Sequence, residues 1–326
     1  MRLPILLLLA SALYAQSYEF VYEKAPFASC HASTLLEAKN GDILSAWFGG
    51  SREGAKDVAI WMSRRTADGW SAPIEMARHD DTPTWNPVLF RTLDGVTWLY
   101  YKFGTSPREW TGAYRFSEDD GRTWSEPRAM PAGLLGPIKN KPISLPDGTV
   151  LSGTSVESYQ SWTSYAEIST DRARTWSRSG PVAHPTQPFG LIQPTLVPIP
   201  GGVRMFMRSR NIGRICASES FDGGETWSPA WETELPNPNS GIDAVALADG
   251  RLVMIYNDTE KGRSPLNLAV SHDYGRTWKR FLDLETDPGE YSYPAIIQGS
   301  DGNLRMVYTW KRERVRYVDV PLTSVP

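Results

Sequence analysis

An octapeptide of the form Ser-x-Asp-x-Gly-x-Thr-Trp recurs along this chain and constrains the fold more than any other feature. It is intact at residues 117–124, 220–227 and 271–278. A degenerate copy at residues 169–176 has Ala173 in place of the glycine, and a truncated copy lies at residues 63–70. The closing tryptophans stand at positions 70, 124, 176, 227 and 278, in steps of 51 to 54 residues. A fixed period of this length indicates a chain of similar supersecondary units.

Each part of the octapeptide has a physical role in a turn. The Asp carboxylate accepts hydrogen bonds from backbone amides of its own turn, the Gly adopts a positive φ, and the Trp packs between neighbouring sheets. We therefore interpret the octapeptide as a structural hairpin element and not as a ligand site.

A second series of turn signals runs in step with the first. Two-residue hairpin signals stand at Asn40-Gly41, Asp94-Gly95, Asp147-Gly148, Gly201-Gly202, Asp249-Gly250 and Asp301-Gly302. Short apolar runs around them give four strands in each of six repeats, which predicts an all-β, six-bladed β-propeller. The sixth repeat lacks an octapeptide, so we expect a strand near residues 18–23 to complete it and close the ring.

The N-terminus and the charge balance restrict location and partners. Residues 1–15 join a basic start to a short apolar run and small residues, which predicts a signal peptide, followed by a single propeller domain over residues 17–326. The apolar run is shorter than the ~20 residues that span a membrane, so we expect a secreted or periplasmic monomer without a membrane span. The net charge is −3 without a basic run, which argues against nucleic acid.

Some classes of site are not indicated by the sequence. No metal-ligand cluster or phosphate-binding glycine loop stands out, so we expect neither a metal nor a cofactor. Cys30 and Cys216 belong to the first and fourth repeats, on opposite sides of a ring. We therefore expect two buried thiols and no disulfide.

Polar residues recur where the innermost strand of each repeat begins. These candidate site residues are His31, Asn86, Lys141, Gln193, Asp243 and Tyr293. Six polar side chains in equivalent positions around one axis predict a polar basin at one mouth of the ring.

The connections between the second and third strands open on the same face and carry arginines. They include Arg52, Arg208, Arg210 and Arg263. Planar guanidinium groups bind carboxylates bidentately, so arginines that converge on one basin predict an acidic glycan as the partner.

On these motifs the chain resembles the sialidase (neuraminidase) superfamily over residues ~20 to 320. The resemblance implies a carboxylate-binding role for Arg210 and Arg263, with Arg208 in the same strand. It also implies Tyr291 as the catalytic nucleophile, Asp57 as the acid/base, and Arg52 as a sugar-binding residue.

Two positions depart from the family pattern. His31 stands where the family has its first arginine, and Gln193 stands where it has the glutamate that activates the tyrosine. The tyrosine then needs another base. Asp243, Glu157 and Glu290 are the candidates, and Asp243 is favoured because it shares the inner-ring position.

Three functions follow from this sequence. The leading one is an exo-acting glycoside hydrolase that removes a terminal acidic sugar, such as a sialic or related nonulosonic acid, through Tyr291 and Asp57. The alternative enzyme is a lyase or hydrolase specific for uronic acids that uses His31 with Tyr291 or Tyr293. A non-catalytic glycan-binding propeller is the third, because a fold does not fix function.

Overall fold

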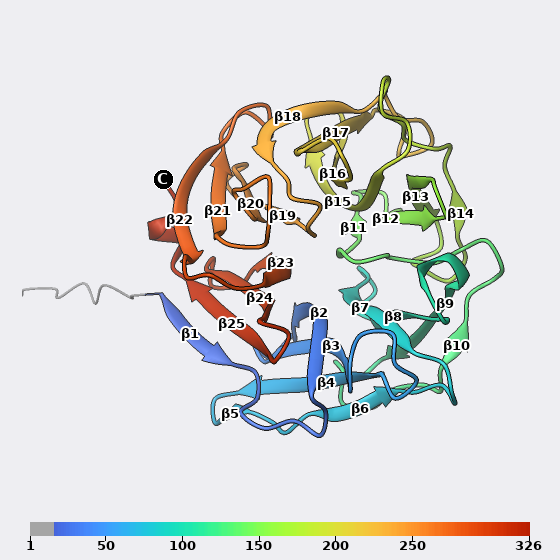
Figure 1. The fold of residues 1–326 in the computed structure, drawn as a ribbon, viewed down its shortest axis with the longest axis vertical. Coiled ribbons are helices and arrows are strands. Elements are labelled where there is room, and N and C mark those ends of the chain that lie inside the picture. Colours follow the sequence, from blue (N-terminus) through green and yellow to red (C-terminus); the bar gives the residue numbers. More distant parts are fainter. Residues whose placement is uncertain (1–15) are drawn as a thin grey trace, which may run out of the picture.

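Six antiparallel sheets stand around a central axis in the computed structural model, which describes residues 16–326 (Figure 1). Each sheet is one blade, so the predicted all-β, six-bladed β-propeller is confirmed. The predicted signal peptide, residues 1–15, lies outside the described residues.

All blades share one order of strands from the axis outward. The innermost strands are β2 (Ser29–Glu37), β7 (Thr84–Arg91), β11 (Ile143–Ser144), β15 (Leu191–Ile199), β19 (Asp243–Ala246) and β23 (Tyr291–Gln298). The second strands are β3 (Ile43–Gly50), β8 (Thr97–Phe103), β12 (Val150–Glu157), β16 (Gly202–Ser209), β20 (Leu252–Tyr256) and β24 (Leu304–Trp310). The third strands are β4 (Ala59–Thr66), β9 (Thr111–Ser117), β13 (Trp162–Ser169), β17 (Arg214–Ser220), β21 (Leu266–Ser271) and β25 (Arg314–Val320).

The outermost strands are more variable. They are β6 (Ile74–Ala77), β10 (Arg128–Ala129), β14 (Ser177–Arg178), β18 (Trp231–Pro236), β22 (Lys279–Glu285) and β1 (Ser17–Phe20), and the first blade adds β5 (Gly69–Trp70) beside β4. Two short 3-10 helices complete the described secondary structure, η1 (Pro107–Glu109) and η2 (Leu322–Ser324).

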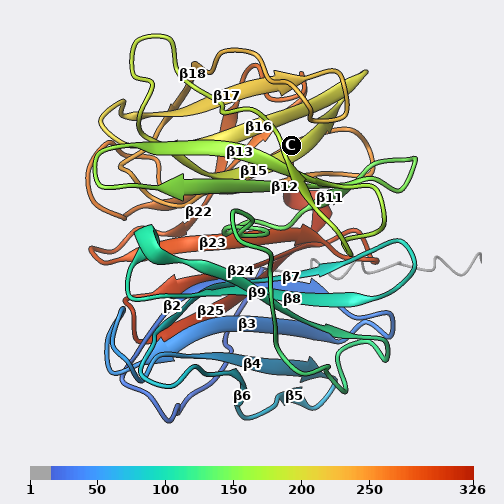
Figure 2. The same ribbon diagram turned by 90° about the vertical axis from the view of Figure 1, so that its right-hand side faces the viewer.

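The strands of each blade cross from one side of the ring to the other, and the outer ones are tilted from the axis, so each strand ends at one of two faces (Figure 1 and Figure 2). We call the face where the innermost strands begin the upper face. It also carries the connections between the second and third strands, such as residues 51–58 between β3 and β4. The lower face carries the hairpins between the innermost and second strands, together with the octapeptides.

The octapeptide forms the turn after the third strand, as its composition predicts. Asp119 Oδ1 accepts hydrogen bonds from the Thr123 backbone N–H and the Ser117 hydroxyl, both at 2.8 Å. Asp171 makes the same two kinds of contact in the degenerate copy, where Ala173 replaces the glycine and adopts a φ of 69°. These carboxylates are therefore occupied within their own turns.

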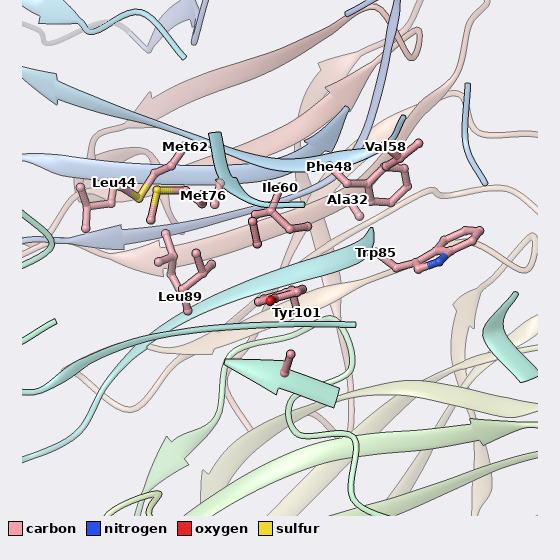
Figure 3. Close-up of a cluster of buried hydrophobic side chains, with 14 of the residues drawn as sticks. Ala32, Leu44, Phe48, Val58, Ile60, Met62, Met76, Trp85, Leu89 and Tyr101 are labelled. Carbon is pink, nitrogen blue, oxygen red and sulfur yellow. The ribbon is translucent and has the colours of Figure 1, made fainter. Parts of the chain in front are cut away.

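Apolar side chains interlock between neighbouring blades. Figure 3 shows Leu44 and Ile60 of the first blade beside Leu89 and Tyr101 of the second, and each of these side chains is at most 1% exposed. Trp124, the last residue of an octapeptide, packs against the same cluster. This dense packing between sheets holds each blade at a fixed position around the axis.

The ring closes through the N-terminal strand. Strand β1 pairs antiparallel with β25 as the outermost strand of the sixth blade, and Figure 1 shows blue β1 beside red β25. Glu19 of β1 accepts hydrogen bonds from Arg65 of β4 at 2.7 and 2.9 Å, which ties the sixth blade to the first. The predicted closing strand is confirmed at residues 17–20.

The two cysteines are free and buried, as predicted. Cys30 lies in β2 and Cys216 in β17. Burial raises the pKa of both thiols to about 12, so both remain protonated and unreactive at neutral pH.

Removal of residues 16–20 is expected to destabilise the ring, because it breaks the β1–β25 pairing and the Glu19–Arg65 ion pair. We expect the melting temperature to fall by about 5 °C or more. Differential scanning fluorimetry measures this shift, with the exposed Lys24→Ala variant as the control. A melting temperature equal to that of the intact protein would show that β1 does not contribute to closure.

Candidate active site

Four innermost strands begin with the same irregularity. Their pairing register shifts just after the first residues, and each shift contains a non-glycine residue with positive φ: Ala32 (56°), Asn86 (34°), Gln193 (54°) and Tyr293 (51°). A β-bulge changes the direction in which a side chain points, and such strained residues concentrate at functional sites. The counterpart of Asn86, Gln193 and Tyr293 in the first blade is Ala32. His31, which the sequence aligns with these residues, lies one position before it.

Side chains from four blades meet at the axis. Tyr293 Oη of the sixth blade accepts hydrogen bonds from Gln193 Nε2 at 3.0 Å and from Arg208 Nη1 at 2.8 Å, both of the fourth blade. The His31 ring of the first blade lies with its centroid 4.1 Å from that of Tyr293. Arg263 of the fifth blade places its Cζ 5.7 Å from the Tyr293 ring centroid. We call these five residues the axial cluster.

The orientation of the Gln193 amide is fixed by Arg208. Arg208 Nη1 donates to Gln193 Oε1 at 3.1 Å, so the amide nitrogen faces Tyr293. The phenolic oxygen thus accepts from two N–H donors, one of them cationic. The two donors are therefore fixed in direction toward this oxygen before any ligand binds.

His31 is held as a neutral imidazole. Its residue is 1% exposed, and its Nδ1 atom has no hydrogen-bond partner within residues 16–326. Burial, together with the positive charges of Arg312, Arg263 and Arg208, holds the pKa of His31 well below its usual value. A neutral imidazole can accept a proton.

An ion-pair chain lies beside the axial cluster at the upper face. Glu290 accepts from Arg263 Nη1 at 2.7 Å and from Arg312 Nε at 2.8 Å, and Arg312 also pairs with Glu53. Sequence reasoning missed Arg312 and Glu53 as site residues. Arg312 lies between β24 and β25, in the connection between the second and third strands of the sixth blade. The same connection carries arginines in other blades, so the repeat pattern of the sequence could have identified Arg312.

Tyr291, the nucleophile predicted from the sequence, lies outside the axial cluster. Its residue is 1% exposed and lies in an apolar cluster with Leu266, Leu268 and Tyr308, between the fifth and sixth blades. The bulge after Ser292 separates the two tyrosines. Tyr293 is the tyrosine that meets the histidine and the arginines.

Asp243 and Lys141, predicted as a base and a substrate ligand, form an ion pair with each other. Lys141 Nζ donates to Asp243 Oδ2 at 2.8 Å, and Asp243 also accepts from the Ile296 N–H at 2.9 Å and the Thr195 hydroxyl at 2.7 Å. Lys141 lines a pocket of about 550 Å³ with Leu145, on the lower side of the ring. Three of the hydrogen bonds that Asp243 accepts join blades, and a fourth comes from the N–H of Ala244 in its own strand.

Asp57 and Arg52, the predicted pair in the loop after β3, make no hydrogen bond or ion pair with the axial cluster within the described residues. Both Asp57 oxygens accept from Ser51, at 2.9 Å from its backbone N–H and 2.9 Å from its hydroxyl, so Asp57 closes its own loop. Burial alone would raise the pKa of Asp57, but the hydrogen bonds from Ser51 lower it overall, which is the wrong direction for a general acid. Arg52 is exposed in the same loop.

Asn86 and Lys139 connect blades beneath the upper face. The Asn86 amide donates to the Ile138 carbonyl at 3.2 Å and thus joins the second and third blades. Its role as a substrate ligand stays a prediction. Lys139 Nζ donates to the Ile242 carbonyl at 2.9 Å and to the Pro294 carbonyl. Burial lowers the pKa of Lys139 to about 7. The sequence reasoning had not singled out Lys139.

Arg210 turns into a neighbouring pocket instead of joining Arg208. This side pocket has a volume of about 570 Å³. Its lining comprises Ser106, Pro107, Arg108, Glu157, Ser158, Tyr159, Trp162, Arg210 and Asn239. Asn239 Oδ1 also accepts from Arg208 Nε at 2.7 Å, so the side pocket and the axial cluster share a wall.

Two kinds of feature are absent from residues 16–326. No helix there has the length and apolar character needed to cross a membrane. The same residues contain no group of three or more histidine, cysteine, aspartate or glutamate side chains that could hold a metal ion.

Comparisons with known proteins agree with this architecture. The profile of the BNR repeat-like domain family matches residues 41–306. No curated protein matches the sequence. A protein of unknown function from Dyadobacter fermentans superposes with a TM-score of 0.80 at 17% identity, covering 93% of this chain and 97% of that one.

Two sialidases also share the fold. The Hadza microbial sialidase Hz136 has a TM-score of 0.78 at 19% identity and covers 92% of this chain and 67% of its own. The NanB sialidase from Streptococcus pneumoniae has a TM-score of 0.76 at 13% identity, covering 95% and 71%. Similarity at this identity shows the fold alone, and the predicted resemblance to the sialidase propellers is confirmed at that level.

The structural role assigned to Asp243 predicts a stability effect. Asp243→Ala leaves the partly buried Lys141 without its carboxylate and the Ile296 N–H and the Thr195 hydroxyl without an acceptor, which costs about 3 to 5 kcal/mol in the free energy of unfolding. Asp243→Asn keeps most hydrogen bonds and is expected to cost less. Chemical denaturation measures both losses, and an Asp243→Ala variant of unchanged stability would contradict the structural role.

Proposed function

Because the chain belongs to the BNR repeat-like domain family, we propose that it is a glycoside hydrolase of the sialidase type, which removes a terminal sugar that bears a carboxylate. The observation that carries this proposal is the placement of Tyr293 Oη against the Arg208 guanidinium, among three arginines and a neutral histidine. Family and fold support the class of enzyme, and the axial cluster supports the chemistry.

Arginine charge provides the affinity for a carboxylate. Arg263 and Arg312 share Glu290, and Arg312 also pairs with Glu53, whereas Arg208 has no ion-pair partner within the described residues. The group therefore carries an excess of positive charge that the carboxylate of a sugar balances. The Arg208 Nη2 group, the guanidinium nitrogen that makes no hydrogen bond within the described residues, would hold that carboxylate beside Tyr293.

Tyr293 is the nucleophile in this proposal. A phenol is neutral, so the substrate carboxylate does not repel it as it would repel an aspartate or glutamate. The Tyr293 oxygen forms a bond to the anomeric carbon while the glycosidic C–O bond breaks. The phenolic proton passes to His31, whose neutral ring lies against Tyr293, and the bound carboxylate of the sugar offsets the arginine charge that otherwise opposes protonation of the imidazole.

Glu157 is the proton donor for the leaving oxygen. It lines the side pocket that shares a wall with the axial cluster, and it has no hydrogen-bond or ion-pair partner within residues 16–326. Burial raises the pKa of Glu157 above its ordinary value, although the charges of Arg208 and Arg210 act in the opposite direction. A carboxyl group with a raised pKa suits general acid catalysis, and its carboxylate then activates the water that releases the sugar.

The two neighbouring tyrosines provide a matched test. Tyr293→Phe should lower kcat on a panel of fluorogenic sialosides and glucuronides by about a thousandfold or more, because it removes the nucleophile. Tyr291→Phe should keep turnover within about threefold of the wild type, since its side chain lies between blades. Melting temperatures measured in parallel establish that both variants fold.

Equal turnover by the wild type and Tyr293→Phe would remove Tyr293 from the mechanism. A wild-type protein that binds these sugars without turning them over would instead be a glycan-binding propeller, and the enzyme proposal would fail.

Elimination is a second candidate, favoured by Gln193 and His31. Gln193 bears an amide that cannot accept the tyrosine proton, whereas a neutral His31 lies against the Tyr293 ring. In a uronic acid, such a base removes the proton from the carbon that bears the carboxylate. A carbon–carbon double bond forms, the neighbouring C–O bond breaks, and the leaving oxygen takes up a proton.

The products distinguish the two reactions. Hydrolysis in water enriched in oxygen-18 should place one labelled oxygen in the released sugar and create no ultraviolet-absorbing product. Elimination should give a conjugated, ultraviolet-absorbing product without the label. Mass spectrometry and absorbance together measure this, and we expect the labelled sugar. The appearance of an unlabelled unsaturated product would replace hydrolysis with elimination.

A further inference from the structure

We propose that the side pocket binds a second acidic sugar, the unit on the leaving-group side of the scissile bond, so that the natural substrate is an oligosaccharide with adjacent carboxylated residues. This inference extends the proposed function, which concerns only the terminal sugar in the axial cluster.

Two arginines in the side pocket have unoccupied guanidinium groups. Arg108 Cζ lies 4.8 Å from the Tyr159 ring centroid, and Arg210 Cζ lies 4.6 Å from that of Trp162. Neither guanidinium hydrogen bonds or pairs with a carboxylate within the described residues. Stacking on an aromatic ring holds one face of each guanidinium and leaves its N–H edge free to bind an anion.

The aromatic residues support a sugar as the ligand. Tyr159 is 73% exposed, an unusual exposure for a large aromatic side chain in this protein, and Trp162 is partly buried beside it. An aromatic ring offers an apolar surface to a sugar ring, while its arginine neighbour offers charge to a carboxylate. Together they fit a sugar that carries a carboxylate better than a simple inorganic anion.

The position of the side pocket assigns it to the leaving group. Asn239 lines the pocket and accepts from Arg208 Nε of the axial cluster at 2.7 Å, so the two sites adjoin. Glu157 lines the pocket at the end of β12, and Arg208 and Arg210 both influence its charge. A proton donor between a terminal-sugar site and its neighbour is in place to protonate the oxygen that joins them.

The charge of the pocket favours an anion. Arg108 and Arg210 carry two positive charges, and Glu157 is the one acidic residue in the lining. The lining therefore stays cationic even when Glu157 is ionised. The volume of about 570 Å³ lies within the range of ordinary small-ligand sites.

Binding to the Tyr293→Phe variant tests this inference without turnover. The probes are disialic acid and digalacturonic acid, each compared with its monosaccharide by isothermal titration calorimetry. We expect one disaccharide to bind at least about tenfold more tightly than its monosaccharide, because one additional carboxylate–arginine contact gives about this factor.

Substitution of the pocket arginines tests whether the tighter binding of the disaccharide comes from the side pocket. In the same background, Arg108→Gln and Arg210→Gln should each reduce the affinity for the disaccharide about tenfold. Arg178→Gln is the matched control, because Arg178 also stacks on an aromatic ring, with its Cζ 4.7 Å from the Tyr165 centroid, but lies on the outermost strand β14. This control should bind like the parent.

The outcomes separate the two proposals. If a disaccharide binds no better than its monosaccharide, or if the pocket arginine variants bind it as the parent does, the second subsite is refuted while the axial site stands. If neither the monosaccharides nor the disaccharides bind, and the wild type also lacks turnover, the proposed function fails and the subsite with it.

Discussion

The pairing of β1 with β25 is the constraint on which the axial site depends. His31, Gln193, Arg263 and Tyr293 come from four different blades, and they meet only when the ring is closed. Packing between sheets then fixes each blade, so the residues that begin the innermost strands converge at one face. The octapeptides themselves make only structural contacts. The repeated blades that they stabilise bring together site residues that are far apart in the chain.

Electrostatics gives the site its chemical character. Burial and the arginines near the axis keep His31 neutral, Arg208 donates a hydrogen bond to Tyr293, and two of the arginines are partly balanced by Glu290. Below them, Lys139 and the Lys141–Asp243 pair are fully engaged in contacts between blades. The polar residues of the axis therefore divide into a cationic layer at the upper face and a structural layer beneath it.

The fold could be predicted from the sequence because the octapeptide acts locally, through hydrogen bonds within eight residues. For the site, the sequence predicts which face of the ring carries it, but not which side chains meet there. Tyr291 and Tyr293 are two residues apart and look equivalent in a regular strand, and only the bulge after Ser292 decides which one reaches the axis. Arg208 lies within β16, whereas Arg210 follows the end of that strand and lines the side pocket.

The central claim is that the axial cluster binds the carboxylate of a sugar. A crystal structure of the Tyr293→Phe variant with a bound acidic monosaccharide tests it most directly. Our account predicts the carboxylate within hydrogen-bond distance of the Arg208 guanidinium, with the sugar ring over residue 293. A sugar bound at the lower face, or at the upper face without contact to Arg208, would contradict it.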